Sequence, residues 1–196
     1  MVINTDYPWQ GQVKLSIQET AGTAWQLRLR VPGWCSNPVV AINGQTIVSP
    51  RIEGGYLVLD RVWEPGDTVE LELNMEASLI EPHPRIDAVR DSVAIQRGPI
   101  VYCIEAVDCA DIDLMDIRID ETAPLQTAWH DDLGLMTIHS SGSVQENEDW
   151  HDRLYRRVSK HDSSPHRQVP LIAMPYYAWA NRGANAMRVW IPRAGA

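Results

Sequence analysis

In the segment QVKLSIQETAGTAWQLRLRV, residues 12–31, apolar and polar side chains alternate over residues 12–18 and again over residues 25–31. This period of two is typical of antiparallel strands with one buried and one solvated face. Pro32 and Gly33 end the second strand, because proline cannot donate to a strand ladder and glycine permits a turn. We expect the two strands to pair as neighbours in one sheet.

Further strands follow at short intervals. Residues 39–42 and 45–48 flank Asn43-Gly44, the pair of residues best suited to a type I′ hairpin turn. Residues 55–60 and 68–74 also alternate, and the turn residues Pro65-Gly66 separate them. Six strands within about 75 residues predict a β-sandwich or jelly roll, because sheets with one apolar face must pack on a second layer.

The chain is expected to divide at residues 81–85, where Pro82 and Pro84 enforce extended backbone. We place the boundary near Asp87, with a first β-sandwich over residues 1–86 and a second over residues 87–196. Strands of the second are predicted over residues 93–96, 100–105, 125–129, 133–139, 169–180 and 187–191, and residues 140–167 form a long polar loop. The predicted fold class is all-β, with two antiparallel, jelly-roll-like sandwich domains.

Composition limits the function classes. The 196 residues include 17 Lys and Arg against 26 Asp and Glu, which gives a formal net charge of −9. Nucleic acids and anionic membranes bind basic surfaces, so we expect neither as a partner. No apolar run approaches the roughly 20 residues that span a bilayer, and the first ten residues lack the features of a signal peptide. A cytoplasmic location is therefore expected.

The reactive residues predict no catalytic or metal site in this chain. Cys35, Cys103 and Cys109 are an odd number without a Cys-x-x-Cys motif, and we expect reduced, buried thiols. The pair Cys103 and Cys109 and the pair His161 and His166 lack the short spacing of zinc ligands. No Gly-x-Ser-x-Gly elbow occurs, and the acidic residues suit solvated strand faces and loops. No cofactor is expected in this chain.

Eight Trp and six Tyr provide all the aromatic rings, since Phe is absent. Such rings combine an apolar face with a polar group, and exposed ones are able to stack on sugars. Most of the tryptophans alternate with polar residues on strands and are expected in the core. Trp9, Trp34 and Trp150 lie in loop segments and are the candidates for glycan stacking.

Four glycines are predicted to be needed for the backbone conformation of turns. They are Gly33, Gly44, Gly98 and Gly183. Because glycine adopts positive φ without steric cost, we expect Gly44→Val to destabilise the fold.

Four segments taken together resemble the C-terminal region of glycoside hydrolase family 127, the β-L-arabinofuranosidase family. They are TDYPW at residues 5–9 with Gly11, LRVPGW at 29–34, QRGPIVY at 96–102, and PYYAWANRG at 175–183 followed by MRVW at 187–190. The segments occur in the family's order and cover nearly the whole chain.

The resemblance implies an (α/α)6 barrel with the active site, followed by two β-sandwich domains, of which this chain matches only the sandwiches. The family's cysteine nucleophile, its zinc and its glutamate acid/base all belong to the barrel. Neither Cys35 nor Cys103 matches the nucleophile, so no catalytic or metal residue is carried over. The chain is expected to start partway into the first sandwich, which leaves a strand edge exposed to self-association.

Two functions follow as expectations. The first is a non-catalytic module that supports the catalytic barrel and contributes contacts to a homodimer. The alternative is a stand-alone β-sandwich protein that binds arabinose-containing glycans with its loop aromatics.

Overall fold

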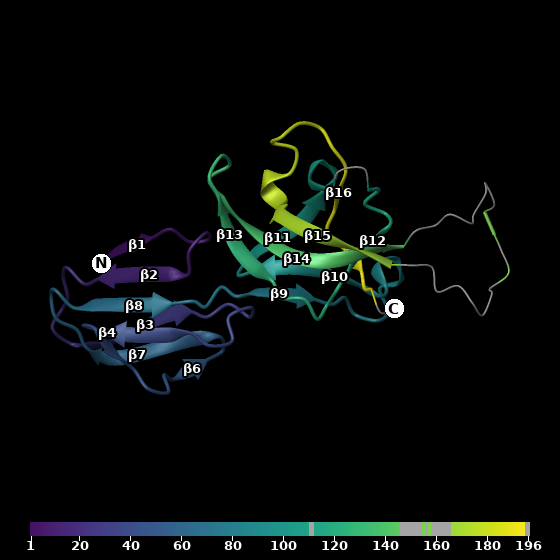
Figure 1. Ribbon diagram of the computed structural model, residues 1–196. Coiled ribbons are helices and arrows are strands. Elements are labelled where there is room, and N and C mark those ends of the chain that lie inside the picture. The colour runs from purple at the N-terminus through teal and green to yellow at the C-terminus, as the bar shows by residue number, and fades with distance from the viewer. Residues whose placement is uncertain (110–111, 146–153, 156, 158–165, 195–196) are drawn as a thin grey trace. The chain divides into compact units, whose positions relative to one another are not determined.

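The computed structural model describes residues 1–109, 112–145, 154–155, 157 and 166–194 (Figure 1). They form two compact units, Met1–Glu76 (unit 1) and Ala77–Ala196 (unit 2). The expected boundary lay further on, near Asp87; the units divide earlier because residues 77–80 form a strand that pairs within unit 2. All helices in the described residues are single 3-10 turns, and the named strands pair antiparallel, which confirms the all-β class.

Unit 1 is a sandwich of two antiparallel sheets. The first has the order β1 (Val2–Thr5), β2 (Gln12–Ser16), β8 (Thr68–Glu72), β4 (Val39–Ile42) and β5 (Gln45–Thr46). The second has the order β3 (Ala24–Arg30), β7 (Tyr56–Val62) and β6 (Ile52–Glu53). One buried cluster contains Leu15 and Val69 from the first sheet and Leu27 and Leu59 from the second, so the alternating residues face each other between the layers.

The two strands that begin and end the segment at residues 12–31 do not pair with each other, contrary to our expectation. β2 lies between β1 and β8, whereas β3 pairs with β7 in the other sheet. The connection between them crosses from one layer to the other. Both strands have an apolar face, and placing them in opposite layers buries these two faces against each other.

The predicted hairpin at Asn43-Gly44 is confirmed. Both residues have positive φ, 50° and 77°, as a type I′ turn requires. The Asn43 side chain also donates to Asp67 Oδ1 (2.7 Å) and accepts from the Thr68 amide (2.8 Å). These bonds connect the turn to the start of β8.

Unit 2 is built on a nine-stranded sheet. Its strands are β9 (Ala77–Ile80), β10 (Ser92–Arg97), β11 (Ile100–Glu105), β12 (Ile117–Ile119), β13 (Gln126–His130), β14 (Leu135–Gln145), β15 (His166–Pro175), β16 (Met187–Arg188) and β17 (Ile191–Pro192). The main order is β12-β14-β15-β11-β10-β17, with β13 on β14, β16 on β11 and β9 on β10. Single 3-10 turns occur at Asp87–Val89, Ala106–Asp108 and Tyr176–Ala178.

The sheet of unit 2 curls until its end strands meet. Ile119 at the end of β12 forms a parallel bridge with Arg193, and the Ala194 amide donates to the Ile119 carbonyl (2.9 Å). The strands therefore enclose a main core that includes Tyr102, Ile138 and Leu171, and a smaller buried cluster contains Leu135, Met174 and Ala178.

Two parts of unit 2 differ from the sequence prediction. β14 and β15 pair from Ile138↔Ala173 to Gln145↔His166, so residues 140–145 and 166–167 of the predicted loop belong to strands. The rest of that loop lies outside the described residues, except for residues 154, 155 and 157. The predicted strand 169–180 ends at Pro175, where the 3-10 turn begins.

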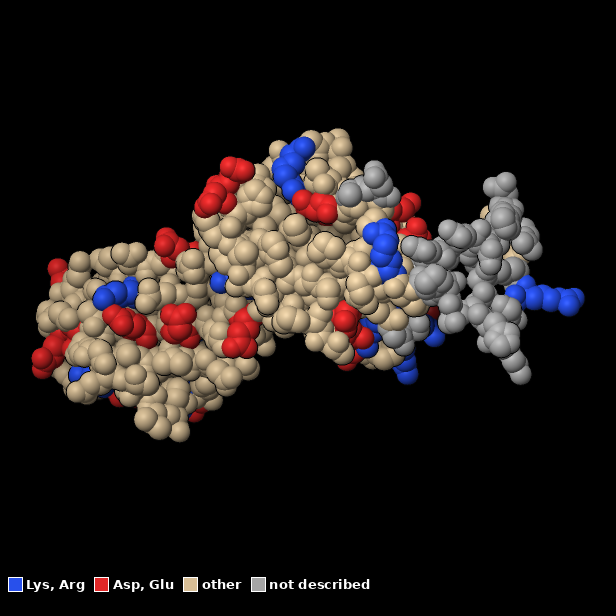
Figure 2. All heavy atoms as spheres, viewed as in Figure 1, with Lys and Arg blue, Asp and Glu red and all other residues tan. Residues whose placement is uncertain are grey.

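The surface has mixed charge. On the face shown in Figure 2, Lys and Arg of the described residues lie among Asp and Glu on both units instead of forming one basic surface. None of the helices in the described part of the chain has the length and apolar character needed to cross a membrane.

Candidate functional site

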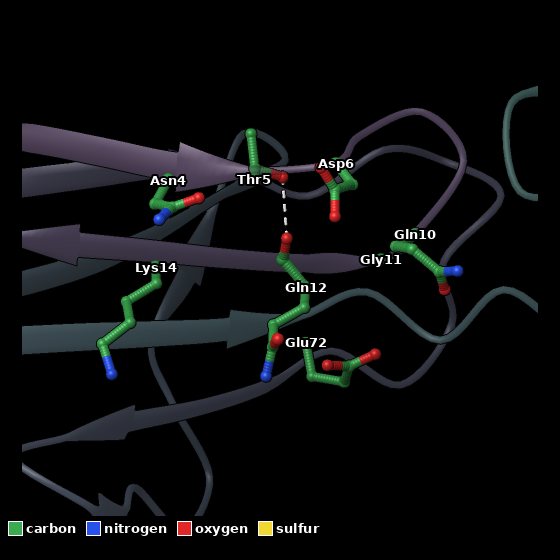
Figure 3. A pocket seen from close by; sticks show the side chains of 8 residues that line it. All are labelled: Asn4, Thr5, Asp6, Gln10, Gly11, Gln12, Lys14 and Glu72. Carbon is green, nitrogen blue, oxygen red and sulfur yellow. Dashed lines mark hydrogen bonds between the residues drawn. The ribbon is translucent and has the colours of Figure 1, made fainter.

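A polar pocket of about 430 Å³ opens on the solvated face of the first sheet of unit 1 (Figure 3). It is lined by Asn4, Thr5, Asp6, Gln10, Gly11, Gln12, Lys14 and Glu72. We call it the β1–β2 pocket.

Strand register explains why these side chains share one face. Asn4 lies opposite Lys14 on neighbouring strands, and Gln12 lies opposite Glu72. Residues two apart on a strand project to the same side, so the four side chains share one face of the sheet (Figure 3), and all four are exposed. The intervening Val13 packs against the core of unit 1.

The loop between β1 and β2 closes one end of the pocket. The Asp6 carbonyl accepts hydrogen bonds from the amides of Trp9 (2.9 Å) and Gln10 (3.1 Å). Gly11 packs directly on Leu73, the residue that follows β8, because a Cβ at position 11 would lie 1.9 Å from the Leu73 carbonyl oxygen. A larger residue at position 11 would push the loop and the sheet apart.

Charges in the β1–β2 pocket come from three side chains. Lys14 Nζ lies 2.8 Å from Glu70 Oε1, so the Lys14 cation is paired with a residue that does not line the pocket. The carboxylates of Asp6 and Glu72 remain and make the pocket acidic.

The three predicted stacking tryptophans have different positions. Trp9 lies in the loop that closes the β1–β2 pocket, and its side chain is 54% exposed. Trp34 is half-buried and packs against the core of unit 1. Trp150 lies outside the described residues. Trp9 therefore belongs to the loop that contributes Asp6 and Gln10 to the pocket, without itself lining it.

The predicted turn glycines also differ from one another. Gly44, Gly98 and Gly183 have φ of 77°, 57° and 105°, in the region that favours glycine. Gly33 has no such φ, and a Cβ there would meet no atom within 4 Å. The structure therefore offers no conformational reason for glycine at position 33, contrary to our expectation.

Unit 2 presents an aromatic surface that the sequence analysis missed. Residues 176–183, here called the aromatic loop, follow β15 and expose Tyr176 (47%), Tyr177 (57%) and Trp179 (41%). We expected these residues on a strand, with Trp179 in the core. The only sequence signal was the density of aromatic residues beside Pro175.

A buried ion-pair cluster holds the aromatic loop on the sheet. Arg182 donates through Nη1 and Nη2 to both carboxylate oxygens of Asp108 (2.7 and 2.6 Å), and through Nη2 to Glu105 Oε2. Glu105 is 1% exposed and also accepts from the Ala180 amide (3.1 Å). The hydrogen bonds to Asp108, followed by those to Glu105, raise the pKa of Arg182, so this cation stays charged.

All three cysteines are free and buried, as expected. Burial, with a further contribution from the Glu105 charge, raises the pKa of Cys103 to about 11. Burial also raises the pKa of Cys109, whose thiol donates to the Glu105 carbonyl (3.3 Å). Both are therefore protonated thiols at neutral pH, which are poor nucleophiles. The described residues bring together no group of three or more His, Cys, Asp or Glu able to hold a metal ion.

Comparison with known proteins decides the family. Residues 1–75 match the model of the β-L-arabinofuranosidase GH127 middle domain, and residues 77–192 match that of the glycoside hydrolase family 127 C-terminal domain. The chain belongs to glycoside hydrolase family 127. The two matched regions meet where units 1 and 2 divide.

Relatives in family 127 are much longer than this chain. A non-reducing end β-L-arabinofuranosidase from Bifidobacterium longum subsp. longum is 32% identical over 95% of the chain, which spans 29% of that enzyme. The crystal structure of a GH127 β-L-arabinofuranosidase from Geobacillus stearothermophilus T6 matches 97% of the chain with 38% identity and a TM-score of 0.86. A further GH127 β-arabinofuranosidase structure matches with 28% identity and a TM-score of 0.81. The chain spans about 30% of these two structures.

Proposed function

We propose that this chain is the non-catalytic β-sandwich module of a family 127 β-L-arabinofuranosidase and that it supports the catalytic barrel. In this proposal the cysteine nucleophile, the zinc and the acid/base glutamate belong to the barrel. The module contributes a rigid surface on which the barrel packs.

The observation that carries the proposal is the aromatic loop. Tyr176 and Trp179 are exposed in a segment whose backbone is held by the buried Glu105 and the partly exposed Arg182. Exposed apolar area on a rigid support is typical of an interaction surface. The aromatic rings offer large contact area at little cost in conformational entropy.

Two further observations favour a supporting role over a catalytic one. The chain spans about 30% of its relatives, which leaves most of each enzyme to carry the chemistry. The Cys103 thiol is buried and its pKa is raised to about 11, opposite to what a nucleophilic thiolate needs. A homodimer contact and a cytoplasmic location stay predictions.

The test uses a chimera in which this chain replaces the matched region of the Bifidobacterium longum enzyme. We expect the chimera to hydrolyse an aryl β-L-arabinofuranoside, and Tyr176→Ala or Trp179→Ala to lower the temperature at which it loses activity. Tyr56→Ala, at an exposed tyrosine of unit 1, is the matched control.

The same substitutions are made in the isolated chain, to separate an effect on the interface from an effect on folding. The proposal expects Tyr176→Ala to leave its melting temperature nearly unchanged, whereas Trp179→Ala also removes the hydrogen bond from Trp179 Nε1 to the Asn185 carbonyl (3.1 Å) and should lower it slightly. Inactivation temperatures equal to that of Tyr56→Ala would contradict a barrel contact at the aromatic loop.

A further inference from the structure

The β1–β2 pocket has no part in the proposed support of the barrel. Its side chains nevertheless offer many uncommitted polar groups. Within the described residues, the side chains of Asn4, Asp6, Gln10, Gln12 and Glu72 make no hydrogen bond or ion pair, whereas Thr5 donates to the Gln12 carbonyl (2.7 Å) and Lys14 is paired with Glu70. The pocket is therefore a surface recess whose donors and acceptors are available to a ligand.

The uncommitted groups match the chemistry of a sugar. Each amide of Gln10 and Gln12 provides two donors and one acceptor oxygen, and each carboxylate accepts from two hydroxyls at once. A sugar hydroxyl both donates and accepts, so adjacent hydroxyls satisfy such a mixed set.

The charge of the pocket selects among polar ligands. Asp6 and Glu72 contribute two negative charges against the single positive charge of Lys14, which also forms a surface ion pair with Glu70. An acidic recess repels uronates, phosphates and other anions. A neutral saccharide avoids this repulsion and still uses both carboxylates as acceptors.

We propose that the β1–β2 pocket is a non-catalytic binding site for a neutral oligosaccharide. Its cavity of about 430 Å³ lies within the range of roughly 300–1,000 Å³ found for small-molecule sites. Binding is non-covalent, lies wholly in unit 1 and is independent of the contact between the aromatic loop and a barrel. The probe is a neutral arabino-oligosaccharide, because the relatives are named for arabinofuranosides.

Isothermal titration of the full chain with this probe tests the proposal. We expect saturable binding with a Kd of about 1 mM, weakened about five-fold by Glu72→Ala or Gln12→Ala through the loss of a hydrogen bond. Asp60→Asn, an exposed acid on the other sheet of unit 1, is the control and leaves Kd unchanged. A galacturonate oligosaccharide of the same length is expected not to bind, and a chelator is expected to have no effect.

Several results would overturn the proposal. They are no saturable binding of the neutral probe, equal weakening by Asp60→Asn, equal binding of the galacturonate oligosaccharide, or loss of binding on addition of the chelator. The isolated chain is used throughout, so a negative titration does not contradict the proposal that the module supports the barrel. A negative chimera experiment likewise does not contradict sugar binding at the β1–β2 pocket.

Discussion

Replacing Arg182 by methionine removes the cation of the buried cluster that holds the aromatic loop. Glu105 is 1% exposed and Arg182 is 22% exposed, so the Glu105 carboxylate loses its charge partner in a nearly dry site. Breaking a buried pair by removing one partner costs about 3–5 kcal/mol. Because water already reaches Arg182 and the Ala180 amide still donates to Glu105, we expect the lower end, about 3 kcal/mol. Methionine keeps the apolar stem in place.

Urea unfolding followed by hydrogen exchange and mass spectrometry measures this loss, since each peptide is assigned to unit 1 or unit 2. We expect unit 2 alone to be destabilised, with the aromatic loop exchanging fastest. Adding Glu105→Gln should restore about 1–2 kcal/mol, because the orphaned charge is removed. Lys14→Met, which breaks an ion pair between side chains 51% and 39% exposed, is the control and should cost less than about 1 kcal/mol. The reasoning is refuted if Arg182→Met costs no more than Lys14→Met.

Three further predictions concern stability. Gly11→Ala should destabilise unit 1 by about 2 kcal/mol, because the new Cβ would lie 1.9 Å from the Leu73 carbonyl oxygen. Gly33→Ala should change the free energy of unfolding by no more than about 0.5 kcal/mol. Equal urea midpoints for the two variants would contradict this. Gly44→Val should cost about 1 kcal/mol or more, since φ at Gly44 is 77°, and an unchanged melting temperature would argue against it. Because burial raises the pKa of Cys103 to about 11, the unfolded chain loses this proton at lower pH than the folded chain, so stability should fall between pH 9 and 11. Urea titrations over this pH range should show that the free energy of unfolding falls less steeply with pH for Cys103→Ala than for the parent. Identical slopes would refute Cys103 as the cause.

Local patterns allowed much of unit 1 to be predicted. The type I′ turn at Asn43-Gly44 follows from the chemistry of two adjacent residues, and the structure confirms it. The alternation at residues 12–31 correctly predicts two strands. It does not predict their partners, because a strand with one apolar face packs equally well beside its neighbour or across from it.

The functional surfaces depend on contacts that are distant in the sequence. Glu105 and Arg182 are separated by 77 positions, so neither local segment predicts the ion pair. The β1–β2 pocket needs Asn4, Gln12 and Glu72 on three strands whose register is set only by folding. Trp34 has a loop sequence typical of an exposed ring, and its packing against the core depends on residues that only folding brings together.

The most direct test of the central claim is the rate of aryl β-L-arabinofuranoside hydrolysis by three proteins measured side by side. They are the isolated chain, the Bifidobacterium longum enzyme without its matched region, and the chimera in which this chain restores that region. A supporting module predicts no turnover by the isolated chain, strongly reduced activity without the region, and recovered activity in the chimera. Turnover by the isolated chain, or a truncated enzyme as active and heat-stable as the chimera, would contradict the account.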